Sequence, residues 1–191
     1  TAGIVVEVED ENRYGIKKGD RVVLDPYLYC GTCYPCSQGR TNCCEKLEVL
    51  GAECFELRQK KNLNTGFDGL VLPGGESTVQ GKLLRELDMF DALKEKIESG
   101  MPVLGTCAGL ILLADQLTND GHVYFGTLPV SVRRNAYGRQ LGSFHTVQEF
   151  AGIGKVPMTF IRAPYIEEAK AGTQVLAEVD GHVVAVRSGN Q

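Results

Sequence analysis

The stretch that most constrains the fold is Met101–Ala114, MPVLGTCAGLILLA. Its first few apolar residues are typical of a short buried strand, and its last residues predict an apolar helix. Cys107 stands at the junction, with Gly105 before it and Gly109 after it. Gly-x-Cys-x-Gly is the thiol form of the nucleophile elbow, a tight strand-to-helix turn whose glycines permit close packing of helix on strand. The sequence therefore predicts an α/β fold with Cys107 above the carboxyl end of a strand.

Two interpretations of Cys107 follow from this pattern. At the N-terminus of a helix, the thiolate is favoured, and the thiolate is the reactive form of cysteine. A cysteine in such a turn can equally be a buried structural residue, because free cysteine is among the most buried residue types. The pattern alone leaves both open.

From about Gly51 onward, the chain alternates between apolar strands and helical segments, which predicts a mostly parallel sheet. We expect one helix, capped by Ser77 or Thr78 and ended by Gly100, because apolar residues recur through it at helical spacing: Leu83, Leu84, Leu87, Phe90, Leu93 and Ile97. The other expected elements are strands at 52–57, 67–73 and 157–164, a polar loop at 60–66, a strand and turn within 122–134 with Phe125, Val130 and Val132 buried, and a hairpin of 173–178 with 182–187 around Asp180-Gly181.

The sequence pattern of residues 1–50 differs from that of the rest of the chain. Two strands are expected, Gly3–Glu9 and Arg21–Pro26, followed by clustered cysteines: Cys30, Cys33, Cys36, Cys43 and Cys44. Four thiolates at this spacing can surround one structural zinc ion, and the alternative is a group of free thiols without metal. The chain has 7 cysteines in all, an odd number that suits a reducing cytosol better than a disulfide framework.

This N-terminal segment resembles the structural-zinc lobe of the zinc-dependent medium-chain alcohol dehydrogenases over about Ala2 to Leu50. The matching stretches are GIVVEV, KKGDRVVLDPY and CGTCYPCSQGRTNCC. The resemblance implies that the zinc ligands are Cys30, Cys33, Cys36 and Cys44, with Cys43 the spare cysteine. The catalytic zinc ligands of that family are missing, and no Gly-x-Gly-x-x-Gly fingerprint follows. Dehydrogenase activity is therefore not expected.

The composition narrows the classes of partner. The formal net charge is −4 and there is no basic block, so nucleic acid is not expected as a partner. No apolar run is long enough to span a membrane and no signal peptide opens the sequence, so we expect a cytoplasmic protein without a membrane partner.

Two further groups of residues are expected near Cys107. The loop Pro73–Ser77 follows a buried strand, and backbone N–H groups at Gly74, together with that of Ala108, could form an oxyanion hole. Arg134 and Arg162 lie at strand ends and could grip a carboxylate with two hydrogen bonds each. The alternative for each arginine is a solvated surface charge.

Residues from about Gly51 to Gln191 closely resemble the glutaminase subunit of pyridoxal 5′-phosphate synthase, a class I glutamine amidotransferase. The specific matches are LVLPGGESTVQGKLLREL, MPVLGTCAGLILLA, VRRNAYGRQLGSF and FIRAPYI. The resemblance implies a three-layer, flavodoxin-like α/β fold, a nucleophilic Cys107, and glutamine-binding residues at these positions: Gly75, Glu76, Ser77, Arg134, Ile161 and Arg162. It implies hydrolysis of L-glutamine to glutamate and ammonia without a cofactor. The ammonia would pass to a barrel-shaped synthase subunit that makes the vitamin B6 cofactor.

The sequence departs from this family at both ends of the similar region. The family's first strand and helix are replaced by residues 1–50, and its His-Pro-Glu strand, which carries the general base, is not matched; His122, His145 and His182 do not occupy that position. We therefore expect two parts, 1–50 and 51–191, and weak glutamine hydrolysis. A natural fusion, an engineered chimera and a sequence artefact all fit. The alternative functions are a non-catalytic zinc-binding structural module and a fragment of a zinc-dependent alcohol dehydrogenase.

Overall fold

The computed structural model describes residues 2–4, 21–23, 55–136, 144–160 and 163–191. The chain divides into two compact units, Thr1–Glu56 and Leu57–Gln191. In the first unit, strand β1 (Ala2–Ile4) pairs antiparallel with β2 (Arg21–Val23), and Ala2 lies opposite Val23. Strand β2 lies within the strand predicted over Arg21–Pro26, and β1 overlaps the start of the strand predicted over Gly3–Glu9. The cysteines from Cys30 to Cys44 lie outside the described residues, so the zinc site stays a prediction.

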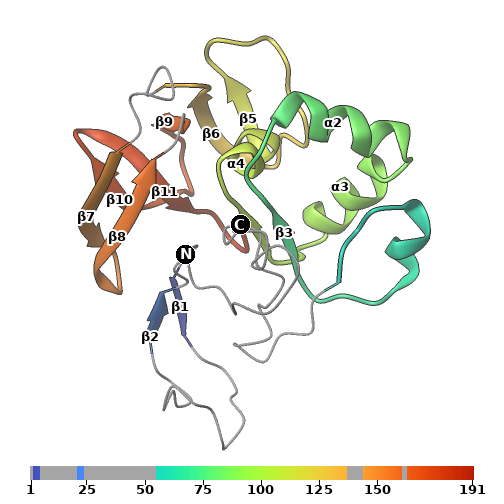
Figure 1. Cartoon of the computed structure of the whole chain (residues 1–191), viewed down its shortest axis with the longest axis horizontal. Coiled ribbons are helices and arrows are strands. Elements are labelled where there is room, and N and C mark those ends of the chain that lie inside the picture. Colours follow the sequence, from blue (N-terminus) through green and yellow to red (C-terminus); the bar gives the residue numbers. More distant parts are fainter. Residues whose placement is uncertain (1, 5–20, 24–54, 137–143, 161–162) are drawn as a thin grey trace, which may run out of the picture. The chain divides into compact units, whose positions relative to one another are not determined.

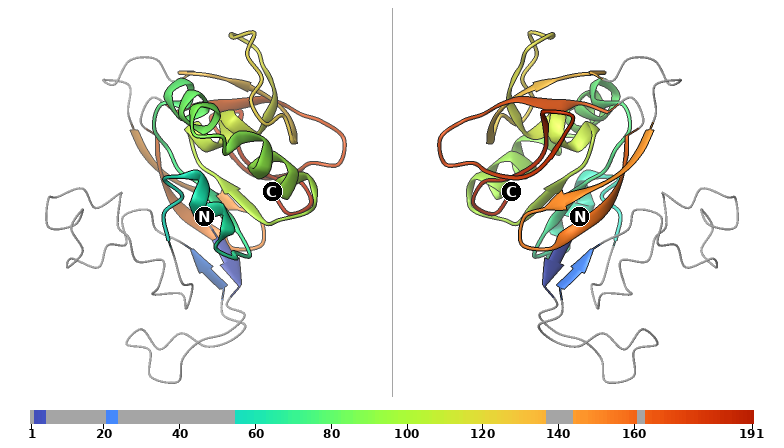
Figure 2. Two further views of the ribbon diagram at one scale, coloured as in Figure 1. Left: turned by 90° about the vertical axis from the view of Figure 1, so that its right-hand side faces the viewer. Right: turned by 90° about the vertical axis from the view of Figure 1, so that its left-hand side faces the viewer.

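The second unit is built around a parallel pair of strands, β3 (Leu70–Leu72) and β4 (Val103–Gly105). Helix α4 (Ala108–Leu113) follows β4 and packs against both strands. Two further helices, α2 (Ser77–Glu86) and α3 (Phe90–Glu98), connect β3 to β4. Figure 1 shows β3 running past α4 towards α2, and both views of Figure 2 show these helices as neighbours. The expected strand-to-helix turn at Cys107 is confirmed.

A five-stranded sheet continues the second unit in the order β10-β11-β9-β6-β5. Its strands are β5 (Ala114–Leu117), β6 (Leu128–Arg133), β9 (Tyr165–Ala169), β10 (Gln174–Val179) and β11 (His182–Arg187). Only β5 and β6 run parallel in this sheet, and the other neighbours are antiparallel, so the described sheets are mixed rather than mostly parallel as predicted. The expected closing hairpin is present as β10 and β11, with positive φ at both turn residues, 50° at Asp180 and 77° at Gly181.

A second hairpin was not predicted from the sequence. Strand β7 (Phe144–Phe150) pairs antiparallel with β8 (Gly154–Phe160) along its whole length, and the rings of Phe144 and Phe160 stack with centroids 4.9 Å apart. Part of β8 was expected as a strand over 157–164, but Ala163 and Pro164 lie outside any strand. The alternation of exposed and half-buried residues along β7 leaves no strongly apolar run, which explains why its pattern was missed.

The core joins α3, α4 and the strands around them. Phe125, Val130 and Val132 are fully buried, as predicted, and the ring of Phe125 stacks on that of Phe90 with centroids 4.7 Å apart. Leu93 and Ile97 of α3 and Leu112 and Leu113 of α4 complete its centre. This core fixes α4, and therefore the turn that precedes it, against the two parallel strands.

The prediction of one continuous helix through Leu83–Ile97 is wrong. Helix α2 ends at Glu86, and α3 begins at Phe90 after Asp88, whose φ is 52°. A left-handed residue cannot continue an α-helix, so the apolar repeat spans two helices that change direction between them. Leu83 and Leu87 are accordingly exposed rather than buried.

Smaller corrections concern residues 52–66 and the start of α2. The expected loop at 60–66 contains a 3-10 helix (Lys60–Asn64), held by the Asn62 side chain, which accepts from the Gln59 N–H at 2.9 Å. Phe55, Glu56 and Leu57 form no strand, and 52–54 lie outside the described residues. Helix α2 is capped by Glu76, which accepts from the Thr78 N–H at 3.2 Å, and not by Ser77 or Thr78.

We predict that Gly109→Ala severely destabilises the second unit. A Cβ at Gly109 would lie 2.0 Å from the carbonyl oxygen of Leu72, which is backbone that cannot move aside. We expect a loss of about 3 kcal/mol or more in the free energy of unfolding, measured by urea denaturation. Gly66→Ala is the control, because nothing lies within 4 Å of a Cβ there. Equal stability of the two variants would contradict the close helix–strand contact.

Candidate functional site at the Cys107 turn

Cys107 lies in a backbone conformation that L-residues rarely adopt. Its φ is 51° and its ψ is −102°, between the end of β4 and the first residue of α4. Strained positions of this kind persist only where the surrounding structure imposes them, and they cluster at functional sites. The thiol is free and partly exposed. The interpretation of Cys107 as a buried structural residue therefore loses its basis.

Glycines on both sides make this turn possible. A Cβ at Gly105 would lie 2.7 Å from the side chain of Leu113 and 2.9 Å from the backbone of Gly109. The turn is closed by two backbone hydrogen bonds: the Thr106 N–H donates to the Leu72 carbonyl at 3.0 Å, and the Gly109 N–H donates to the Thr106 carbonyl at 2.8 Å. The turn is thus bonded directly to the end of β3, where the second loop of the site begins.

That loop, Pro73–Glu76, runs beside Cys107. A Cβ at Gly74 would lie 3.4 Å from the Cβ of Cys107, so the backbone of Gly74 lies in contact distance of the thiol-bearing residue. Gly75 has a φ of 140°, a conformation that only glycine adopts readily. Because Ala108 is the first residue of α4, its N–H has no acceptor within the helix. The backbones of the two predicted oxyanion-hole residues, Gly74 and Ala108, therefore both adjoin Cys107.

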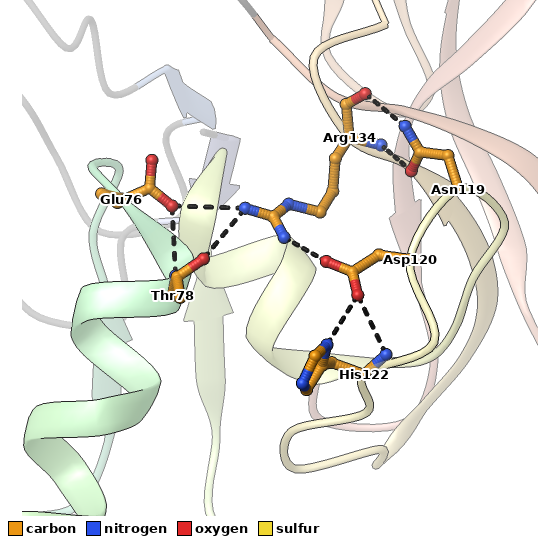
Figure 3. A network of polar contacts seen from close by, with 6 residues as sticks. All are labelled: Glu76, Thr78, Asn119, Asp120, His122 and Arg134. Atoms are coloured by element: carbon orange, nitrogen blue, oxygen red, sulfur yellow. Dashed lines mark hydrogen bonds and ion pairs between the residues drawn. The ribbon is translucent and has the colours of Figure 1, made fainter.

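Arg134 follows β6 and crosses to the start of α2 (Figure 3). One guanidinium nitrogen donates to Glu76 at 3.2 Å and to the Thr78 hydroxyl at 3.1 Å, and the other bonds to the Asp120 carboxylate. Its backbone is held by Asn119, which accepts from the Arg134 N–H at 3.1 Å and donates to its carbonyl at 3.0 Å. The Arg134 side chain is 17% exposed, which rules out a freely solvated charge.

Asp120 is the charged carboxylate that holds the Arg134 guanidinium in this network. Hydrogen bonds from the His122 ring at 2.7 Å and the His122 N–H at 3.1 Å, together with Arg134, lower the pKa of Asp120 from its usual 3.8 to about 2. The carboxylate is therefore charged throughout the physiological range and fixes the guanidinium. Asn119, Asp120, Arg134 and Asn135 line a cavity of about 220 Å³ at this point.

The predicted site residues divide into those the structure brings together and those it does not describe. Cys107, Ala108, Gly74, Gly75, Glu76 and Ser77 belong to two adjoining turns, and Arg134 contacts Glu76. Ile161 and Arg162 lie outside the described residues, so the expected grip by two arginines stays a prediction. The sequence does not predict that Thr78, Asn119 and Asp120 are partners of Arg134. The polar run Thr118–Asp120 between two apolar segments is the only signal, and it concerns Asn119 and Asp120 alone.

The buried hydroxyl of Ser77 and the three histidines are the remaining polar groups to consider as parts of the site. Ser77 is 2% exposed, and within the described part of the chain its hydroxyl has no hydrogen-bond partner. Each of the three histidines contacts another residue: His122 contacts Asp120, His145 contacts the Thr159 hydroxyl at 2.8 Å, and the His182 ring stacks on Tyr165.

Comparison with known proteins identifies the second unit. The profile of the SNO glutamine amidotransferase family matches residues 38–191. The chain belongs to this family. A protein called pyridoxal 5′-phosphate synthase subunit PdxT from Desulfitobacterium hafniense (strain Y51) is 64% identical over 145 residues, which are 76% of this chain and 73% of the relative. The protein of the same name from Haemophilus influenzae (strain PittGG) is 52% identical over 149 residues, 76% of this chain and 78% of the relative.

A solved structure described as a glutamine amidotransferase matches with a TM-score of 0.70 at 40% identity, covering 75% of this chain and 77% of that one. This match confirms the predicted α/β fold class. The profile of the alcohol dehydrogenase GroES-like domain matches residues 1–71, which supports the two-family composition inferred from the sequence. Among the described residues, no helix is both long and apolar enough to cross a membrane.

We predict that Ser77→Ala leaves the stability unchanged or slightly raised. The substitution removes a buried hydroxyl that has no partner, whereas Ser131→Ala removes an equally buried hydroxyl that lies 3.2 Å from Gln116 Oε1 and 3.3 Å from Glu168 Oε2. Ser131→Ala should therefore cost about 1 kcal/mol. Urea denaturation of both variants checks this, and a comparable loss in Ser77→Ala would show that its hydroxyl is paired.

We also predict a pH-dependent effect of Asp120→Asn. A depressed carboxyl pKa stabilises the folded state above the usual pKa of 3.8, and this contribution is lost as the pH falls through about 2. The substitution should therefore destabilise the protein at pH 7 and cease to matter near pH 2. Thermal unfolding of both proteins across this range is the measurement. A stability difference independent of pH would contradict the charged Asp120–Arg134 pair.

Proposed function

We propose that the chain is a glutaminase whose nucleophile is Cys107 and that it provides ammonia for pyridoxal 5′-phosphate synthesis. The observation that carries the proposal is the strained turn at Cys107 beside the Gly74 backbone. Acyl transfer requires a nucleophile next to hydrogen-bond donors for the carbonyl oxygen, and this turn would present the Cys107 thiol next to backbone N–H groups. The relatives named as synthase subunits supply the biological context.

In this proposal, the Cys107 sulfur attacks the side-chain amide carbon of L-glutamine. The carbonyl oxygen takes up negative charge and is stabilised by the N–H groups of Gly74 and Ala108. The proton given up by the Cys107 thiol is taken up by the amide nitrogen, and collapse of the tetrahedral intermediate then breaks the carbon–nitrogen bond and releases ammonia. Water then hydrolyses the γ-glutamyl thioester, which releases glutamate and restores the thiol. No metal or organic cofactor takes part in these steps.

The charged end of glutamine would be recognised by Glu76 and Arg134, which carry opposite charges 3.2 Å apart. An amino acid carries an ammonium and a carboxylate on one carbon, so adjacent opposite charges match it. Gly75, Ser77, Ile161 and Arg162 complete the proposed binding set. The ammonia would go to a barrel-shaped synthase subunit as partner. A reduced Cys107 is essential to this chemistry, which fits the cytoplasm.

Covalent labelling tests the nucleophile and the binding site together. The diazoketone 6-diazo-5-oxo-L-norleucine carries a glutamine-like head and should alkylate Cys107 stoichiometrically, as mapped by peptide mass spectrometry. Excess L-glutamine should protect the thiol, and L-glutamate should protect it less. Labelling that is absent, spread over other cysteines or indifferent to glutamine would overturn the proposal.

Replacing Arg134 should slow this labelling. Arg134→Met removes the proposed carboxylate contact, and we expect a rate at least 10-fold lower at limiting reagent, as for loss of a charge-assisted hydrogen bond of about 1.5–3 kcal/mol. Arg133→Met is the control, because Arg133 is exposed and pairs with Glu167 instead. Circular dichroism establishes that both variants fold. Equal rates in the two variants would contradict the role of Arg134.

A second function is proposed for the N-terminal part, because the alcohol dehydrogenase profile matches residues 1–71. We propose that Cys30, Cys33, Cys36 and Cys44 hold one structural zinc ion, within a separate segment of residues 1–50. Elemental analysis of protein never exposed to chelator should give about one equivalent of zinc, and Cys30→Ser should lose it, whereas Cys43→Ser should retain it. Zinc below a tenth of an equivalent would exclude the site.

A further inference from the structure

The side-chain amide of Gln80 bonds to the loop that runs beside Cys107. Its Nε2 lies 3.3 Å from the carbonyl oxygen of Pro73 and 3.3 Å from that of Gly74. An amide nitrogen has two N–H groups, so one can be donated to each carbonyl. Gln80 is in the first turns of α2, and its backbone N–H is bonded to the Glu76 carbonyl at 3.0 Å. The side chain is therefore anchored on a regular helix while it holds an irregular loop.

These two hydrogen bonds determine where the neighbouring N–H groups point. In a trans peptide, the carbonyl of one residue and the N–H of the next point in opposite directions, and the described residues contain no cis peptide bond. Fixing the Pro73 carbonyl on Gln80 therefore directs the Gly74 N–H away from Gln80, and fixing the Gly74 carbonyl does the same for the Gly75 N–H. Without such an anchor, glycine peptides can rotate easily.

The Gln80 amide is also in close contact with the loop. A Cβ at Gly75 would lie 3.1 Å from Nε2, so the backbone passes directly over the amide. Within the described part of the chain, no other donor bonds to the Pro73 or Gly74 carbonyl. Among the described residues, the Gln80 Oε1 atom is buried without a hydrogen-bond partner. This unpaired acceptor lowers the stability of the folded state, and the two hydrogen bonds donated by Nε2 offset the loss.

We propose that Gln80 is a positioning residue that orients the Gly74 and Gly75 peptides, so that the Gly74 N–H serves the oxyanion hole at Cys107. This inference rests on the proposed glutaminase function. It assigns to Gln80 no contact with substrate; the side chain acts only through the loop. Loss of its two donors should leave glutamine binding nearly intact and weaken the polarisation of the reacting carbonyl.

The test compares two reagents on the full chain. With the glutamine-like diazoketone, the Cys107 sulfur bonds to the diazo carbon, that carbon gains a proton, and dinitrogen leaves; its ketone oxygen takes the place of the amide oxygen of glutamine. Iodoacetamide reacts at a saturated carbon by loss of iodide and develops no charge in an oxyanion hole. The ratio of the two rates therefore reports on the hole and corrects for thiol exposure.

Gln80→Met preserves the length of the side chain, removes both donors and removes the unpaired acceptor. We expect the maximal rate with the diazoketone to fall about 10-fold or more, its half-saturating concentration to change less than about 2-fold, and the iodoacetamide rate to stay within about 2-fold of wild type. Gln174→Met, at an exposed position of β10, should change none of these.

Each other outcome is informative. A fall of both rates together in Gln80→Met, or an unchanged diazoketone rate, would overturn the role of Gln80 while leaving the glutaminase proposal standing. A wild-type chain in which glutamine gives no protection against the diazoketone would overturn the glutaminase proposal, and the role of Gln80 with it.

Discussion

The contact between Gly109 and the Leu72 carbonyl is the constraint on which the rest of the second unit depends. Helix α4 approaches β3 so closely that no side chain fits between them. This approach, with the bond from the Thr106 N–H to the same carbonyl, brings the end of β3 and the end of β4 to one point. The chain must turn sharply there, and Cys107 takes the left-handed conformation as a consequence. The buried residues of α4 and β4 supply the packing that stabilises this strained turn.

Electrostatic contacts then attach more distant segments to the same point. Arg134 joins the end of β6 to the N-terminal turn of α2 through Glu76 and Thr78, and Asp120 holds it from the segment before β6 (Figure 3). The Arg134 and Asp120 side chains are only partly exposed, so solvent screens their ion pair less than it screens a pair on the surface. The charges that would receive an amino acid are thereby set in place before any ligand arrives. Such pre-organisation reduces the cost of binding.

The structure could be predicted from the sequence where a single local pattern determines it. Gly-x-Cys-x-Gly predicted the turn at Cys107, and Asp180-Gly181 predicted the β10–β11 hairpin, because glycine and turn chemistry act over a few residues. The helix break at Asp88 could not be foreseen, because the apolar spacing runs on through it and a single left-handed aspartate carries no strong signal. The roles of Asn119 and Asp120 could not be derived, since their partner Arg134 lies on a separate segment, after β6. The role of Gln80 depends on the irregular path of the loop that precedes α2. The glutamine-binding set came from resemblance rather than from spacing.

We infer that the Cys107 turn and the Pro73–Ser77 loop form one glutamine site. A crystal structure of the Cys107→Ala variant with bound L-glutamine tests it most directly. We expect the side-chain carbonyl oxygen of glutamine to lie within hydrogen-bond distance of the N–H groups of Gly74 and Ala108, with the α-carboxylate against Arg134. Glutamine bound elsewhere, or with its amide turned away from residue 107, would contradict it.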